Sequence, residues 1–332
     1  MINKLPINLI NLKLGDKFNQ FINELPKKLK KLTICGSFNQ SINNLPEDLE
    51  YLDITGSFNR PIDNLPNKLK VIKLKNHFNQ NIDKLPENLE YLRLYFDFNK
   101  YINNLPINLK ILIMGCDFDN TVDNLPENLE ILVLYDRFKQ SINKLPKKLK
   151  KLALGDYFNN PIDNLPEDLE ILKIGHTFNQ SINKLPKKLK FLEIGNEFNQ
   201  LINELPENLE CLILGDKFNQ PINKLPNRLM LLEIGDKFNQ CIDNFSISLE
   251  YIKLGRSFNK DIKNYSKKKS SSINKEYSAS PNSQFKTTII LKNFNATVLD
   301  NIIEGNLENI IIKNDRTYYG RPFYNELYQF PN

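Results

Sequence analysis

The sequence predicts a mainly β fold: a parallel β-solenoid of thirteen 20-residue repeats with a degenerate C-terminal cap. Three observations predict it. The period is strict, because residues 1–260 divide into equal units with no insertion or deletion. Apolar residues return at the same positions of each unit, numbered here from 1 to 20. Each unit also holds one short alternating segment, such as 131–134, that is typical of a β-strand.

Six positions of the repeat carry apolar side chains and predict the core. Position 2 is Ile or Val, position 9 is always Leu, and position 18 is always Phe. Positions 5, 12 and 14 are Leu, Ile or Met, except that Phe245 stands at position 5 of the last unit. A single repeat cannot bury its own apolar face, so we expect the stacked repeats to share one continuous core.

Positions 9 to 14 read Leu-x-x-Leu-x-Leu, as in 129–134, and predict one strand per repeat. Successive strands are expected to pair in parallel, because each follows the last after one full turn of the chain. Proline occupies position 6 from Pro6 to Pro226, and it lacks the N–H that a helix needs. The return segment between strands is therefore predicted to be extended rather than helical.

Two polar columns are predicted to hold neighbouring repeats together. Asparagine fills position 19 in most repeats, and stacked amides satisfy the backbone groups of a turn; Asp119 and Lys139 are expected to break this column. Position 10 alternates between Lys and Glu from Lys30 to Glu210, so that opposite charges lie side by side in a parallel stack. We interpret both columns as structural and not as ligand sites.

The pattern resembles that of leucine-rich repeats. More specifically, Phe38-Asn39-Gln40-Ser41-Ile42-Asn43-Asn44-Leu45-Pro46, which recurs at 178–186, is similar to the FNIP repeat, a family of social amoebae and of the giant DNA viruses that infect amoebae. The resemblance implies a leucine-rich-repeat-like solenoid that serves as a protein-interaction scaffold. Some relatives carry an F-box-like N-terminal region and imply a ubiquitin-ligase adaptor, but no such region precedes the first repeat here.

Composition and charge exclude several classes of function. The net charge of +6 is spread along the repeats, which is no electrostatic footprint for nucleic acid. No apolar run approaches the roughly 20 residues that a bilayer span needs. The four cysteines fall too far apart in a stacked solenoid to form disulfides, so we expect reduced thiols. With no leader before the first repeat, we expect a cytoplasmic protein, or one of the host cytoplasm if it is viral.

No arrangement of residues suggests catalysis. The two histidines, His77 and His176, lie five repeats apart and have no cysteine or second histidine at metal-ligand spacing. The acidic pairs face lysines and lack the isolation that raises a carboxyl pKa. The sequence therefore predicts neither an enzyme nor a metal or cofactor site.

A partner protein is expected to bind on the concave face of the sheet, where positions 11, 13 and 15 point. Repeats 4 to 7 depart most from the pattern there, with an exposed apolar strip beside added aromatic residues, which favours an interaction surface. The alternative is that Ile, Val and Tyr simply suit β-strands. The candidate partner-binding residues, with the aromatic ones as anchors and arginine as the polar contact, are Tyr91, Arg93, Tyr95, Phe96, Ile111, Ile113, Ile131, Val133 and Tyr135.

The chain is predicted to divide into a solenoid at 1–264, a flexible Lys/Ser-rich linker at 265–284, and degenerate repeats with an aromatic cap at 285–332. The run Lys267–Lys269 fits either a solvated linker or a localisation signal. Residues 285–295 and 307–312 repeat the strand pattern, and we expect them to close the stack.

The first repeat shows no cap, and its strand edge is predicted to be unpaired. A homodimer through this edge is one hypothesis. The sequence thus leaves three functions open: a scaffold that binds a partner on its concave face, a self-associating structural protein, and a substrate adaptor linked to a ubiquitin ligase.

Overall fold

The computed structural model describes residues 5–242, 248–260 and 287–290, which build one continuous sheet. Strands follow each other in sequence order from β1 to β14. They are β1 (Asn11–Leu14), β2 (Lys31–Ile34), β3 (Tyr51–Ile54), β4 (Val71–Leu74), β5 (Tyr91–Leu94), β6 (Ile111–Met114), β7 (Ile131–Leu134), β8 (Lys151–Leu154), β9 (Ile171–Ile174), β10 (Phe191–Ile194), β11 (Cys211–Leu214), β12 (Leu231–Ile234), β13 (Tyr251–Leu254) and β14 (Thr287–Ile290).

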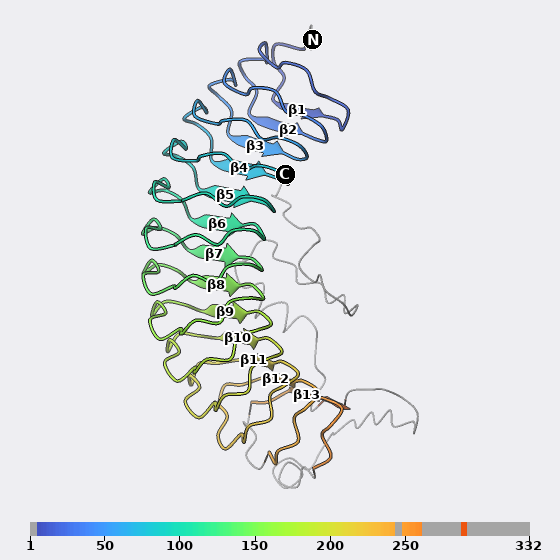
Figure 1. Cartoon of the computed structure of the whole chain (residues 1–332), viewed down its shortest axis with the longest axis vertical. Coiled ribbons are helices and arrows are strands. Elements are labelled where there is room, and N and C mark those ends of the chain that lie inside the picture. Colours follow the sequence, from blue (N-terminus) through green and yellow to red (C-terminus); the bar gives the residue numbers. More distant parts are fainter. Residues whose placement is uncertain (1–4, 243–247, 261–286, 291–332) are drawn as a thin grey trace.

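The first thirteen strands pair in parallel, each residue facing the one 20 positions further along, as Leu112 faces Leu132. The described return segments contain turns and no helix, as the proline at position 6 predicts. Figure 1 shows the turns stacked into an arc, with loops on both sides of the row of strands. The predicted parallel solenoid is confirmed.

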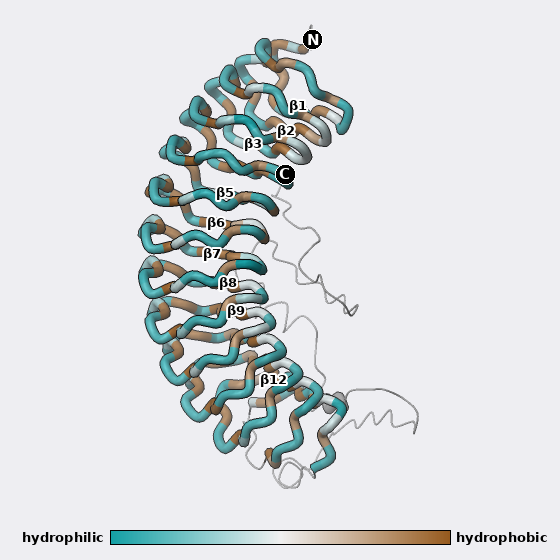
Figure 2. Tube along the Cα trace, in the orientation of Figure 1, coloured by the Kyte–Doolittle hydropathy of each residue, from teal (hydrophilic) through white to brown (hydrophobic). Residues whose placement is uncertain are grey.

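The predicted apolar columns form a single core between the strands and the return segments. Figure 2 shows the hydrophobic residues recurring at the same places in every turn. The phenylalanines of position 18 stack along the whole arc, with ring centroids 6.0 Å apart for Phe38 and Phe58. Paired strands lie only about 4.8 Å apart. In an arc, elements on the outer side lie further apart than elements on the inner side. The wider spacing of the phenylalanine rings therefore places them outside the strands.

The asparagines of position 19 form the predicted ladder. The Asn39 N–H donates to Asn19 Oδ1 at 2.9 Å, and the Asn199 N–H donates to Asn179 Oδ1 at the same distance. One expectation is wrong: Asp119 does not break the ladder, because its Oδ1 accepts the Lys139 N–H at 2.8 Å. A carboxylate oxygen accepts as an amide oxygen does, whereas Lys139 has no side-chain acceptor for the next repeat.

Opposite charges of position 10 meet as predicted. The Lys30 Nζ lies 2.9 Å from Glu50 Oε1, and Lys110 Nζ lies 2.7 Å from Glu90 Oε2. These side chains are exposed, so each pair contributes less than about 1 kcal/mol. Their periodicity matters more than their strength, because a slip of one repeat would oppose like charges along the column.

The last strand differs from the expected continuation of the stack. β14 pairs with β13 antiparallel, with Ile290 facing Tyr251 and Thr287 facing Leu254. A further repeat would have paired in parallel. The reversal is possible because the connection from β13 is longer than the return segment of a repeat, so the chain can enter the edge from either end. The predicted linker at 265–284, the run Lys267–Lys269 and the rest of the cap at 285–332 lie outside the described residues.

Candidate partner-binding surface

The nine predicted site residues come together on three neighbouring strands and the turns that follow them. They form two rows across the sheet. Tyr91, Ile111 and Ile131 face one another in register at position 11. Arg93, Ile113 and Val133 do so at position 13. Tyr95, Phe96 and Tyr135 lie just after the ends of β5 and β7.

This strip is less exposed than the sequence predicts. Tyr91 is 3% exposed and Ile113 is 2% exposed. The other seven residues are half-buried. Alternation along a strand indicates which face a side chain occupies, but not how far its neighbours cover it. On adjacent strands only about 4.8 Å apart, large side chains of the same column pack against each other.

A small pocket lies at the C-terminal ends of β5 to β7, and four of the predicted residues line it. Its walls are Arg93, Leu94, Tyr95, Phe96, Gly115, Cys116 and Tyr135. Gly115 stands between the two tyrosines of the same column and leaves space that a side chain would fill. A Cβ there would lie 2.3 Å from the Tyr95 carbonyl carbon, so glycine is required by the close backbone approach. The volume of about 20 Å³ suits one small group and not a metabolite.

Cations stacked on tyrosine rings border the strip on its N-terminal side. The Arg93 guanidinium carbon lies 4.2 Å from the centre of the Tyr95 ring. Lys73 Nζ lies between two rings, 5.3 Å from Tyr51 and 5.4 Å from Tyr91. Sequence reasoning missed Lys73. The sequence signal for this contact is a lysine at position 13 of one repeat and tyrosines at position 11 of the repeats before and after it. A parallel stack brings these three side chains together.

Burial shapes the charge of this region. It lowers the pKa of Lys73 to about 8, against the opposing effect of the Asp53 carboxylate. Burial also raises the pKa of the Tyr135 hydroxyl. Burial therefore destabilises the charged form of Lys73, and the Tyr135 hydroxyl stays protonated at neutral pH.

The C-terminal part of the concave face, at β10 to β12, is covered by its own side chains. Phe191, Cys211 and Leu231 are buried against one another in register, beside an ion pair of 2.8 Å between Lys173 and Glu193. Burial raises the pKa of the Cys211 thiol far above its usual range, so it does not form the thiolate that nucleophilic catalysis needs. All four cysteines are free, as expected.

The histidines occupy the turns after the strands. His77 Nδ1 lies 2.8 Å from Asp97 Oδ2, and His176 Nε2 lies 3.6 Å from Glu197 Oε1. Within the described part of the chain, no group of three or more His, Cys, Asp or Glu is placed to hold a metal ion. The same described residues include no helix long and apolar enough to cross a membrane.

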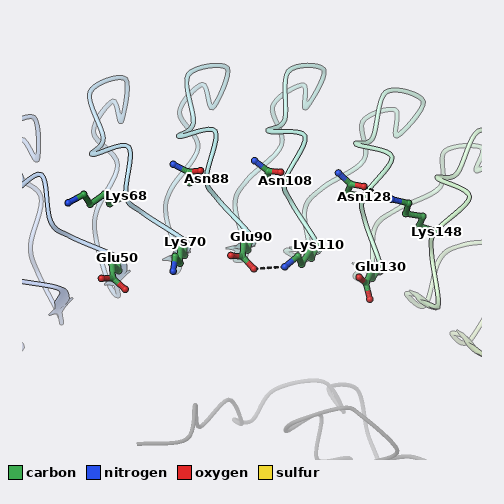
Figure 3. A pocket seen from close by; sticks show the side chains of 10 residues that line it. All are labelled: Glu50, Lys68, Lys70, Asn88, Glu90, Asn108, Lys110, Asn128, Glu130 and Lys148. Atoms are coloured by element: carbon green, nitrogen blue, oxygen red, sulfur yellow. Dashed lines mark hydrogen bonds and ion pairs between the residues drawn. The ribbon is translucent and has the colours of Figure 1, made fainter.

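A larger groove, of about 780 Å³, follows the flank of the solenoid (Figure 3). Positions 8 and 10 of successive repeats line it with Lys, Glu and Asn. Most of these polar groups are already engaged: Asn108 Nδ2 donates to the Glu87 carbonyl at 3.0 Å, and Lys148 Nζ donates to Asn128 Oδ1 at 2.7 Å. Ligand pockets are mostly apolar, so this groove is better explained as the polar seam between repeats.

Comparison with known families settles the nature of the repeat. The model described as FNIP Repeat matches residues 2–37, 78–117, 121–157, 142–177, 158–197 and 198–237, which together cover more than half of the chain. The chain belongs to the FNIP repeat family. Among curated proteins, none matches the chain.

Solved structures place the FNIP solenoid among leucine-rich-repeat folds. CroV588, a circular leucine-rich-repeat protein of a giant virus, is 34% identical with a TM-score of 0.58. The match covers 78% of this chain and 48% of CroV588, so the FNIP chain spans about half of that protein. YopM of Yersinia enterocolitica is 22% identical (TM-score 0.50; 75% and 64% covered). The internalin InlF of Listeria monocytogenes is 18% identical (TM-score 0.55; 71% and 77% covered).

The FNIP matches include the part of the chain that carries the candidate site. Residues 78–117 and 121–157 contain all nine predicted residues. The family pattern is set by core and turn positions, whereas the site lies at positions 11, 13, 15 and 16, which vary between repeats. Leucine-rich-repeat solenoids of this kind are generally non-catalytic scaffolds for protein interaction. Which surface of this FNIP protein binds is a separate question.

Proposed function

We propose that this FNIP protein is an interaction scaffold whose concave face, at β5 to β7, binds a partner protein. The observation that carries the proposal is the pocket between Tyr95 and Tyr135, over Gly115. Aromatic side chains around a small pocket are typical of the anchor points where one partner inserts a side chain into another. The half-buried Ile131 and Val133 of β7 supply apolar area near it.

The same features favour a protein partner over other ligands. The pocket of about 20 Å³ is far smaller than the roughly 300–1,000 Å³ of small-molecule sites. The apolar rows of β6 and β7 hold no cation to contact phosphate, which nucleic-acid binding needs. Arg93, held over the Tyr95 ring, is positioned as the polar contact at the border.

The test is affinity capture from a cell lysate with the full chain and with a Tyr95→Ala, Tyr135→Ala variant. We expect the partner bound by the intact chain to be lost at least tenfold from the variant, because both walls of the pocket are removed. The matched control is Tyr101→Ala, Tyr157→Ala, which removes two exposed tyrosines, 66% and 53% accessible, away from the pocket. Circular dichroism checks that each variant is folded.

Equal capture by the intact chain and the pocket variant would contradict the proposal. Loss of the partner from the control as strongly as from the pocket variant would contradict it too. The adaptor hypothesis rests on family resemblance alone, and ubiquitin-ligase subunits among the captured proteins would support it.

A further inference from the structure

The outer edge of β1 is one of the two unpaired end edges of the described sheet, the other being that of β14. β1 lies at the end of the sheet, and no described residue pairs with its outer side. Leu9, Leu12, Leu14 and Phe18 are only partly buried there. Their counterparts one repeat later, Leu29, Leu32, Ile34 and Phe38, each have 0% exposure. A strand edge with an apolar end face is a ready template for another strand.

The first repeat also departs from the chain's own surface pattern, and in the apolar direction. Position 10 is charged in the ten repeats from Lys30 to Glu210, but in the first repeat it is Ile10, which is 52% exposed. Ile7 is 81% exposed on the same side. End repeats of a solenoid usually carry a polar outer face that keeps them soluble. Here positions 7 and 10 of the end repeat are both apolar, a combination that no interior repeat has.

Gly15 shows that the end face has room for a neighbouring backbone. A Cβ at Gly175 would lie 2.5 Å from the Gly155 carbonyl carbon, because the preceding repeat passes directly against it. A Cβ at Gly15 would meet nothing within 4 Å. The surface that receives a preceding repeat elsewhere in the stack meets no described residue at Gly15.

The other end of the sheet shows how an edge of this solenoid accepts a strand. β14 lies antiparallel on β13, with Ile252 paired in register with Ile289. An antiparallel strand therefore fits the geometry of this sheet edge. Because β14 occupies the outer edge of β13, a second copy cannot add its β1 there. Pairing β1 with β1 of a second copy gives a closed two-fold dimer, whereas β1 on the outer edge of β14 would give an open-ended chain of copies.

The backbone of β1 has the groups that this pairing needs. The carbonyls of Ile10 and Leu14 accept from Lys31 and Cys35 of the next repeat, both at 3.0 Å. Since strand residues alternate in the direction of their hydrogen bonds, the N–H and C=O of Asn11 and Lys13 point outward. Two antiparallel copies of β1 can exchange four hydrogen bonds by pairing Asn11 of each copy with Lys13 of the other.

Charge and packing select this register. It places Leu12 opposite Leu12 of the second copy, which continues the core column across the joint. A shift of two residues would instead place Lys13 directly opposite Lys13, and like charges opposite each other are destabilising. The two-fold arrangement satisfies both edges equally, as in most homodimers.

We propose that β1 pairs antiparallel with β1 of a second copy of this chain, so that one sheet and one core run through both copies. Ile7 and Ile10 lie at the rim of the joint. The concave face at β5 to β7 is not part of this interface and stays available to a partner.

The test measures the mass of the full chain by light scattering and sedimentation over nanomolar to micromolar concentrations. We expect twice the mass of the 38.8 kDa chain at micromolar concentration. Lys13→Pro removes one outward N–H in each copy, and proline is tolerated on an edge strand where that N–H does not bond within the chain. Ile10→Glu restores the alternating column and reduces the apolar rim. Each substitution is expected to raise the dissociation constant at least tenfold.

Met230→Lys is the matched control, because Met230 is the other apolar residue of position 10 and lies near the opposite end of the solenoid. We expect it to leave dimerisation unchanged. Hydrogen exchange adds a direct readout: the amides of Asn11 and Lys13 should exchange more slowly as protein concentration rises. A monomer at all concentrations overturns the proposal. So does a dimer that is unaffected by both substitutions in β1, or one that Met230→Lys weakens equally.

Discussion

At the residue scale, the concave face is built from side chains that stack on their counterparts one repeat away. This stacking makes the position of each charge important. Lys151 stands at position 11 between Ile131 and Ile171, where the neighbouring repeats carry apolar groups. Burial lowers its pKa to about 8, while the nearby Glu170 and Glu130 carboxylates oppose the shift and Lys150 adds to it. A lysine in such a row costs stability while it is charged.

Lys151→Ile is therefore expected to stabilise the protein at pH 7 by about 1–2 kcal/mol, less than the full pKa shift implies because the side chain keeps part of its hydration. The folded-state pKa of about 8 lies below the ordinary 10.5, so the penalty is complete below pH 8 and disappears by about pH 10.5. Urea unfolding of both proteins across this range should show the advantage of the variant shrinking as pH rises.

Lys110→Ile is the control for this prediction. The hydrogen bond and charge of Glu90 raise the pKa of the exposed Lys110, so its removal should give no gain in stability at pH 7. An advantage of Lys151→Ile that stays constant up to pH 10.5 would show that its cause is packing and not charge.

At the element scale, the turn after each strand depends on one acceptor passed from repeat to repeat. Amide oxygens at position 19 accept the N–H of the residue 20 positions later, and the Asp119 carboxylate does the same. Lys139 interrupts this ladder, and only the contact of the next side chain with the backbone remains, where Asn160 Nδ2 donates to the Lys139 carbonyl at 2.5 Å. An interior turn with a missing acceptor is a weak point, because Asn159 is exposed and forgoes only the net value of one hydrogen bond, about 0.5–1.5 kcal/mol.

Restoring the acceptor should strengthen the solenoid at this turn. We expect Lys139→Asn to be about 1 kcal/mol more stable than Lys139→Ala in chemical unfolding. The alanine variant is the proper reference, since both substitutions remove the contact of Lys139 Nζ with the Tyr157 ring at 5.5 Å. Equal stability of the two variants would mean that solvent already satisfies the Asn159 N–H.

At the scale of the whole molecule, the solenoid is a one-dimensional stack in which each repeat contacts only its neighbours. Its second period, of 40 residues, comes from the alternating charges of position 10. Deleting one repeat preserves the core columns but places like charges side by side. Deletion of 161–180 brings Lys150 next to Lys190, whereas deletion of 161–200 brings Lys150 next to Glu210.

The two deletions should respond to salt to different extents. Salt screens exposed charges, both attractive and repulsive, so added salt is expected to lower the melting temperature of the one-repeat deletion, with its single like-charge pair, less than that of the two-repeat deletion. The intact chain, with alternating pairs, should follow the two-repeat deletion. Thermal melts by circular dichroism at low and high salt check this. A common response of all three chains would contradict a role for the charge column in the register of the stack.

The sequence by itself determined the architecture of this protein, because a strict period leaves little choice. Six apolar columns and a proline in each return segment specify parallel strands, an extended return and one shared core. The same reasoning placed the six site residues that lie on β5 to β7 on one face, since alternation along a strand assigns each side chain to a side of the sheet.

Only the tertiary structure decided how those residues meet the solvent and each other. The depth of Tyr91 and Ile113, the stacking of Lys73 between two tyrosines, and the pocket over Gly115 depend on the packing of adjacent strands and on how closely the backbones approach. Asp119 in the ladder and the antiparallel direction of β14 were also decided there. Each is a contact between residues far apart in the chain, whose distance and direction a repeat pattern does not contain.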